Sequence, residues 1–561
     1  ASGNNAGTIN ITGQKSVGVY NAGTFTMGSG SIVSSAENAI GIYSDNTAGT
    51  TVSGGTITAK DGGIALFSGD NSTINLSGSN ILKAEAGGLL FYNFLNSSNT
   101  ITGKYNITAP ATAQVDAGGM VLYTKVDSVA DISTVAGSLK AAFTGASNLT
   151  VNMAAGSSIL YVDTAGSSAS ITAFTGLPDL TTGFFNFVGT GYKGYVMNGF
   201  NLSLDNDAES NLDTGSYGKI QFLNSDITVT NGTTVNGTAA GQVAIVQKNK
   251  SGSVNVNDRK LTNNGTIALT GNQSTGIAGD YTAIKNTSTG QIKLGTNSIG
   301  IYTANGSEAV NSGLIEFGSG SVGIYGQNYF DGTKTSSVLG YGNDKINITN
   351  EKDIKTISGG VTGDAFGIYS KNILNASDAS IVLTSASNID LKGTGTVIGV
   401  YSEKSDISNK GSIKVDSSTS GVGIYASAGS TGTGANNTGS IEITDGNSVG
   451  IFAENSNISY NGNVTIDNVT SGIGMYSKAT AGNTSSITNN GLLSLGASVT
   501  GMYSEGASSA NFGNITNTGT ITSLASSDKA IGMYIGSNGK GTNTGTISLT
   551  ALGTDKSQVG V

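Results

Sequence analysis

Carboxylates are the side chains in this sequence best suited to catalysis, because it contains no histidine and no cysteine. That composition excludes a Ser-His-Asp or Cys-His nucleophile and a thiolate or imidazole metal site. Paired carboxylates could still act as acid and base in glycoside hydrolysis. The densest acidic group lies in an Asn- and Ser-rich segment and comprises Asp205, Asp207, Glu209 and Asp213. Such a segment is typical of a solvated turn, so we predict no catalytic residue, no bound metal and no cofactor.

The charge of the chain disfavours nucleic acid as a partner. The 561 residues include 27 Lys and Arg and 36 Asp and Glu, a net charge of −9, and Arg259 is the only arginine. Neutralising phosphates requires a basic surface, which this composition does not supply. We therefore predict that the chain binds no nucleic acid. Without cysteine there are no disulfides, and stability must come from burial and backbone pairing.

Two aromatic-rich segments are candidates for a binding surface. Their candidate residues are Phe184, Phe185, Tyr192, Tyr195, Tyr329 and Phe330. Aromatic side chains on excursions from a rigid framework often bind partners, so we predict a ligand-binding role for these six. The alternative is that the first four fill widened coils and that the last two belong to one poorly matched coil.

The elements that must position these residues follow from a short repeat. An aliphatic-Gly-aliphatic-aromatic cassette reads Val17-Gly18-Val19-Tyr20, Ile40-Gly41-Ile42-Tyr43 and, much later, Val422-Gly423-Ile424-Tyr425. Its glycines are separated by 23 residues between Gly18 and Gly41 and by 27 between Gly423 and Gly450. A second cassette, Asn-x-Gly-x-aliphatic, falls between the copies, and we expect it to form turns in which glycine takes positive φ.

A unit of about 25 residues with two or three short strands is typical of one coil of a parallel β-helix. Strands in successive coils then pair with one another, and identical side chains stack in ladders. No window shows sustained helical periodicity, so helices should be scarce. The sequence predicts an all-β parallel β-helix, or solenoid, with an irregular, aromatic-rich central excursion.

The repeat also predicts the domain organisation. Residues 1–90 and 261–561 should form regular coils, whereas residues 91–260, where the cassette fades, should form an irregular or expanded region or a protruding subdomain. Neither end reads as a capping repeat, so we expect the chain to belong to a longer array.

The repeated aromatic residue has two interpretations. Strict alternation in Ile40-Gly41-Ile42-Tyr43 would place the aliphatic side chains on one face and glycine with tyrosine on the other. An exposed tyrosine ladder beside a flat glycine strip could then stack against sugar rings. Alternatively, glycine vacates interior space and tyrosine packs there, or an outer tyrosine ladder stabilises neighbouring coils without any ligand.

The combination of Asn-x-Gly-(Thr/Ser)-Ile with (Val/Ile)-Gly-(Ile/Met)-Tyr-(Ser/Ala) resembles the passenger domains of the very large type V autotransporter adhesins of fusobacteria. The resemblance covers roughly residues 1–90 and 260–561. It implies a right-handed β-helix on the outer surface of the bacterium, exported and anchored through a C-terminal outer-membrane barrel that lies outside this chain. Members of the family attach to host cells and to other bacteria, some through galactose-type glycans and some through inhibitory receptors of immune cells.

We therefore expect a non-enzymatic adhesin segment whose partner is a host-cell receptor, a glycan or another bacterium. Two alternatives stay open. One is a β-helical polysaccharide-processing enzyme, and the other is a spacer whose full-length protein binds its ligand elsewhere.

Overall fold

The computed structural model describes residues 2–47, 49–77, 81–126, 132–164, 180, 184–190, 192–199, 201–204, 220–223, 225–248, 260–328, 346–372, 379–524 and 528–550. This part of the chain is almost entirely parallel β-sheet, with about 3% helix, and forms a β-helix of about 17 turns. It divides into two compact units, unit 1 (residues 1–227 and 245–247) and unit 2 (residues 228–244 and 248–561). The predicted fold class is confirmed.

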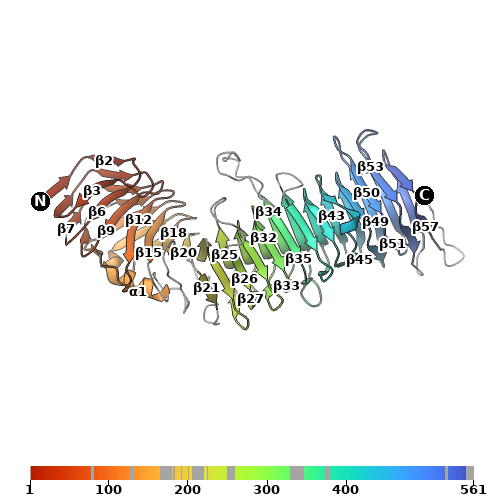
Figure 1. The fold of residues 1–561 in the computed structure, drawn as a ribbon, viewed down its shortest axis with the longest axis horizontal. Helices are drawn as coiled ribbons and strands as arrows, with labels where there is room; N and C mark the ends of the chain where they lie inside the picture. Colours follow the sequence, from red (N-terminus) through yellow and green to blue (C-terminus); the bar gives the residue numbers. More distant parts are fainter. Residues whose placement is uncertain are drawn as a thin grey trace. The chain divides into compact units, whose positions relative to one another are not determined.

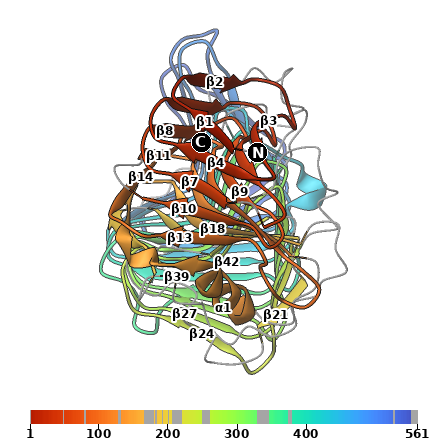
Figure 2. The same cartoon turned by 90° about the vertical axis from the view of Figure 1, so that its left-hand side faces the viewer.

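Each coil contributes one strand to each of three sheets, and the strands of unit 1 stack in chain order (Figures 1 and 2). Its first sheet contains β1 (Ser2–Asn5), β4 (Thr24–Met27), β7 (Gly49–Val52), β10 (Thr73–Leu76), β13 (Lys104–Ile107) and β16 (Phe143–Thr144). Its second sheet contains β2 (Thr8–Ile11), β5 (Ser31–Ser34), β8 (Thr56–Ala59), β11 (Ile81–Ala84), β14 (Ala111–Val115), β17 (Leu149–Met153) and β19 (Asn186–Gly189). Its third sheet contains β3 (Val17–Asn21), β6 (Ile40–Ser44), β9 (Ile64–Ser68), β12 (Leu89–Leu95), β15 (Met120–Val126), β18 (Ser158–Asp163), β20 (Lys193–Asn198) and β22 (Ile220–Leu223). Unit 1 also holds β21 (Asn201–Leu204) and the 3-10 helix η1 (Ala146–Asn148).

Unit 2 repeats the same plan. Its first sheet contains β26 (Lys260–Asn263), β29 (Ala283–Asn286), β32 (Glu308–Asn311), β35 (Ile346–Asn350), β38 (Ala379–Leu383), β41 (Asp406–Asn409), β44 (Thr431–Gly432), β47 (Asn457–Tyr460), β50 (Ser485–Asn489), β53 (Gly513–Asn517) and β56 (Lys540–Asn543). Its second sheet contains β24 (Thr234–Gly237), β27 (Thr266–Leu269), β30 (Gln291–Leu294), β33 (Leu314–Phe317), β36 (Asp353–Thr356), β39 (Asn388–Gly393), β42 (Ser412–Ser417), β45 (Ser440–Thr444), β48 (Asn463–Asp467), β51 (Leu492–Leu495), β54 (Thr520–Ser523) and β57 (Thr546–Ser548).

The third sheet of unit 2 contains β28 (Thr275–Asp280), β31 (Ile299–Ala304), β34 (Ser321–Asn328), β37 (Ala365–Asn372), β40 (Thr396–Glu403), β43 (Ser420–Ser427), β46 (Asn447–Glu454), β49 (Ser471–Ala479), β52 (Val499–Gly506) and β55 (Ile531–Ile535). The 3-10 helix η6 (Gly434–Asn436) lies between two strands of this unit, and the boundary between the units falls within β23 (Asp226–Val229) and β25 (Val243–Lys248). We call the third sheet of each unit its aromatic sheet.

The aliphatic-Gly-aliphatic-aromatic cassette occupies the aromatic sheet, and its copies pair in register. Between β3 and β6, for example, Tyr20 lies opposite Tyr43. The cassette does not alternate strictly, because in β6 Gly41 and Ile42 are both buried while Ile40 and Tyr43 are half-buried. The prediction that glycine and tyrosine share a face is therefore wrong, and there is no flat glycine strip beside these tyrosines.

The first of the two inward-facing residues is glycine because a larger side chain there has no space between the coils. A Cβ atom on Gly450 would lie 2.5 Å from the carbonyl oxygen of Gly474 in the next coil and 2.6 Å from Cγ1 of Val464. Both distances are too short for any carbon atom, so the coils can stack closely only around glycine. Glycine therefore vacates interior space, as one alternative raised by the sequence holds, but the tyrosine does not pack into that space.

Replacing Gly450 by Ala should therefore lower the free energy of unfolding by about 1–3 kcal/mol, the usual effect of overpacking a core. Gly363→Ala is the matched control, since the nearest atom to its added Cβ would be 3.8 Å away. Urea unfolding should show a lower midpoint for the first variant alone. Equal midpoints would contradict a steric role for the glycine column.

The glycine of the Asn-x-Gly cassette has a similar role. Gly439 is not among the residues with positive φ, contrary to expectation, and a Cβ on it would lie 2.1 Å from the carbonyl oxygen of Gly411. In the first sheet of unit 2 several asparagines point inward, and two of them, Asn263 and Asn311, belong to this cassette. Asn263, Asn286, Asn311 and Asn350 form a buried ladder in which each side-chain amide donates to the next side-chain carbonyl at 2.7–2.8 Å. The asparagine ladder can therefore form only where the coils stack closely, and its hydrogen bonds in turn hold the coils together.

The core of unit 1 widens along the chain. At the cassette position that is Gly41 in β6, the following strands carry Ala65, Leu90, Val121 and Ile159, all buried. Helix α1 (Ile132–Ala142) is inserted at this wide end, between β15 and β16, and the structure buries its Val135 and Leu139. Larger coils thus need larger interior side chains, as one interpretation of the aromatic-rich stretch proposed.

Candidate functional site

The structure places four of the six predicted site residues inside the fold. Phe184, Phe185, Tyr192 and Tyr195 are all buried, with at most 5% of each residue exposed. A buried ring cannot contact a partner outside the fold, so these four do not form the exposed surface that the sequence predicts. Tyr329 and Phe330 lie outside the described residues, as do the acidic candidates Asp205, Asp207, Glu209 and Asp213.

The four buried rings belong to the widened core. Phe184 stacks on Phe185 with ring centroids 4.2 Å apart, and Phe185 also contacts Phe143 and Phe91 at 5.2 and 5.7 Å. Tyr195 pairs with Leu160 at the inward-facing second aliphatic position of the cassette. Packing in the interior of the coils therefore accounts for these buried rings.

The exposed or half-buried aromatic residues form a ladder on the outer face of each aromatic sheet. In unit 1 the ladder consists of Tyr20, Tyr43, Phe67, Tyr92, Tyr123 and Tyr161, and in unit 2 of Tyr302, Tyr325, Tyr369, Tyr401, Tyr425, Phe452, Tyr476, Tyr503 and Tyr534. Neighbouring rings are 4.4–5.6 Å apart between centroids. These are ordinary distances for aromatic pairs that stabilise adjacent strands.

Several ladder tyrosines donate a hydrogen bond from the hydroxyl to a carboxylate in the next coil. The Tyr425 hydroxyl donates to Glu454 at 2.8 Å and the Tyr20 hydroxyl to Asp45 at 2.7 Å, and each acid follows the next ladder residue by two positions. A residue two positions along a strand faces the same side. A second outward row therefore runs beside the ladder, and we call it the flanking row.

Burial raises the pKa of two ladder tyrosines of unit 2, Tyr302 and Tyr369. Desolvation is the main cause for Tyr302 and Tyr369, whose pKa values are raised to about 12 from the ordinary 10.0. A neighbouring acid adds to the rise in both cases. The folded protein therefore holds these hydroxyls protonated at a pH where an unfolded chain would begin to lose the protons.

This difference predicts loss of stability in alkali. Between pH 10 and 12 the unfolded state releases phenolic protons that the folded state retains, so the free energy of unfolding should fall as pH rises through this window. Urea unfolding at several pH values should show the decline, and Tyr369→Phe should reduce it. A phenolate absorbance that develops fully near pH 10 while circular dichroism is unchanged would contradict the prediction.

The parallel stacking of rings in the unit 1 ladder is broken between Phe67 and Tyr92, whose ring centroids are still 4.7 Å apart. Tyr43 and Phe67 are stacked at an interplanar angle of 21°, and Tyr92 and Tyr123 at 18°, but Phe67 and Tyr92 meet at 62°. Phe67 and Tyr92 therefore meet edge to face, unlike the stacked pairs on either side of this break.

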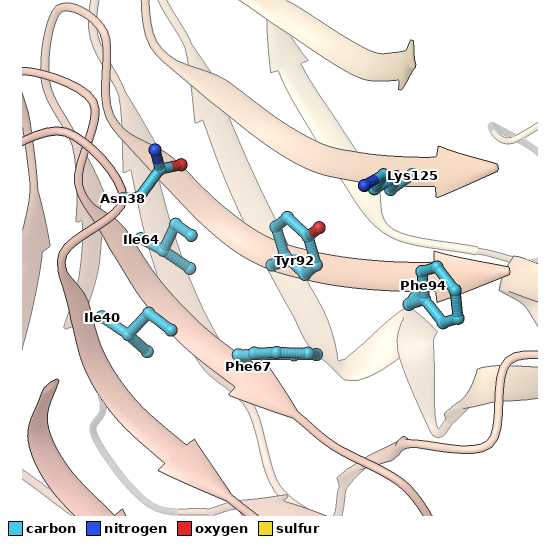
Figure 3. A pocket seen from close by; sticks show the side chains of 7 residues that line it. All are labelled: Asn38, Ile40, Ile64, Phe67, Tyr92, Phe94 and Lys125. Atoms are coloured by element: carbon cyan, nitrogen blue, oxygen red, sulfur yellow. The ribbon is translucent and has the colours of Figure 1, made fainter. Parts of the chain in front are cut away.

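A groove with a volume of about 310 Å³ lies at this break. Four successive coils line it, through Asn38, Ile40, Ile64, Phe67, Tyr92, Phe94 and Lys125. Figure 3 shows Asn38 and the two isoleucines at one end, Phe94 and Lys125 at the other, and Phe67 with Tyr92 between them. We call this feature the aromatic groove. Its size is at the lower end of the range for small-ligand sites, about 300–1,000 Å³.

Sequence reasoning missed the aromatic groove, although part of its signal was present. Phe94 and Lys125 each follow a ladder residue by two positions, so strand alternation puts them on the ladder's face. The change of ring tilt between Phe67 and Tyr92 has no such signature in the sequence.

Among the described residues, the lining of the groove holds one amine, Lys125, and one phenol, Tyr92, and no carboxylate. Within the described residues there is no cluster of three potential metal ligands. The helices in that same part of the chain are too short or too polar to span a bilayer. No protein-family model, no curated protein and no solved structure matches the chain.

Proposed function

We propose that this chain is the ligand-binding segment of a bacterial surface adhesin, and that its aromatic groove binds a glycan of a host cell or of another bacterium. The groove is the observation that carries the proposal, since it combines aromatic rings with one amide and one amine. Sugar rings pack their C–H faces against aromatic faces, and their hydroxyls need a few polar partners. Such a lining favours binding without turnover, so the proposed role is not enzymatic.

The solenoid supports the same role, because an array of coils can hold a groove on rigid strands at the outer surface of a cell. The resemblance to autotransporter passenger domains points to the same location. A protein partner, including an inhibitory receptor of immune cells, is the alternative that the following experiment tests.

The purified chain should bind to epithelial cells and to a panel of immobilised glycans. Phe94→Ala should weaken this binding about tenfold or more, as expected for an aromatic residue that lines a binding site. Phe452→Ala is the matched control, because this phenylalanine is a ladder residue of unit 2. Circular dichroism should be the same for both variants.

Three results would contradict the proposal. Cell binding that resists enzymatic removal of glycans would indicate a protein receptor, and absence of any binding would indicate a spacer. Equal effects of the two variants would place the glycan elsewhere on the aromatic sheets.

A further inference from the structure

The lining of the aromatic groove includes a lysine, Lys125, which lies in the flanking row. Among the residues that the structure describes, Lys125 is the only charged one in the lining, and the net charge of the chain is −9. Across the parts of the chain that are described, no carboxylate lies within 4.0 Å of its Nζ atom. By contrast, Lys478 in the flanking row of unit 2 lies 3.6 Å from Glu454.

The nearest acid of the same row is already engaged by neutral donors. Asp163 pairs with Lys125 in the register of β15 and β18. One of its oxygens accepts a hydrogen bond from the Tyr123 hydroxyl and the other from the Asn198 amide at 2.9 Å. The ammonium group of Lys125 is therefore available to an anion that enters the groove from the side of Phe94.

The opposite end of the groove has different chemistry. Ile40 and Ile64 offer apolar surface, and exposed Asn38 offers an amide that can both donate and accept hydrogen bonds. An occupant that fits both ends carries a carboxylate on one side of a sugar ring and a small acylated amine on the other. N-acetylated sialic acid has this arrangement, whereas a hexuronic acid has no methyl group for the isoleucines and galactose has no charge for Lys125.

We propose that the aromatic groove binds a terminal N-acetylated sialic acid, with its carboxylate on Lys125, its ring against Phe67 and Tyr92, and its acetamido group at Asn38, Ile40 and Ile64. This assignment rests on the proposed function of the groove as a glycan site. It restricts the ligand to sialylated glycans, because one sugar must place a carboxylate on Lys125 and a methyl group at the apolar end at the same time.

Titration calorimetry of the whole chain with three methyl glycosides tests the assignment. The sialoside should bind about tenfold more tightly than the galactoside or the glucuronide, and its affinity should fall with added salt. Lys125→Gln should weaken sialoside binding about tenfold. Lys371→Gln is the matched control, since Lys371 follows Tyr369 by two positions in unit 2 and should leave binding unchanged.

The outcomes separate the two proposals. Equal binding of sialoside and galactoside, with no effect of Lys125→Gln, would overturn the sialic acid assignment and leave the groove as a neutral glycan site. Equal binding of sialoside and glucuronide would overturn the role of the apolar end. Failure of all three sugars, and of sialylated glycans on the panel, would overturn both proposals.

Discussion

Replacing Phe185 by Ala is expected to lower the free energy of unfolding of unit 1 by about 3–5 kcal/mol, the usual loss when a buried phenylalanine is truncated. Phe185 is 1% exposed and contacts Phe184, Phe143 and Phe91. The rings around it cannot collapse into the vacated volume without breaking their own contacts. Urea unfolding followed by circular dichroism measures the effect.

Phe94→Ala provides the comparison for this variant, since Phe94 is half-buried on the outer face of the same unit. It should change the unfolding midpoint much less while reducing glycan binding. A Phe185→Ala protein that unfolds normally but no longer binds would restore Phe185 as a contact residue and contradict its assignment to the core.

Asn286→Leu should lower the free energy of unfolding by about 2–5 kcal/mol, because it disrupts the asparagine ladder from both sides. The side-chain amide of Asn263 loses the acceptor it has at 2.8 Å, and the side-chain oxygen of Asn311 loses its donor. Each buried polar group left without a partner costs about 1–3 kcal/mol. Thermal and urea unfolding should both report the loss.

Asn347→Ala is the control for the ladder. Asn347 lies in the same sheet but is exposed, and its side chain accepts one exposed hydrogen bond, from Ser380 at 2.8 Å. This variant should change stability by less than about 0.5 kcal/mol, as is usual at surface sites. Similar losses for the two variants would mean that the inward ladder adds nothing beyond an exposed hydrogen bond.

Most of the fold could be predicted from the sequence because each coil repeats the same short-range pattern. Copies of the cassette at similar spacing predict that equivalent strands of successive coils stack on one another. Stacked strands bring equivalent side chains together in ladders. Helix α1 was missed because its 11 residues are too few to give a sustained period and include Gly137 at their centre. The sequence also did not reveal that two successive residues of each cassette face inward. This departure from alternation arises from contacts between adjacent coils, which the sequence of a single strand does not show.

The candidate site was harder to predict than the fold. Clustering of Phe184, Phe185, Tyr192 and Tyr195 in the sequence suggested a surface, but an expanding core needs the same residue types. The aromatic groove depends on the angle between two rings in neighbouring coils, which the packing of whole side chains determines. Phe94 and Lys125 could have been placed on the correct face from alternation alone.

The division of the groove among successive coils has an evolutionary consequence. Ile64 and Leu89 occupy the same register position 25 residues apart, so deleting one such repeat joins equivalent strands and preserves the pairing of the rest. The same deletion would remove Phe67 and bring the strand of Ile40 beside that of Tyr92. Unequal recombination within the gene would then change the residues that line the groove in a single event, while the remaining strands keep their pairing.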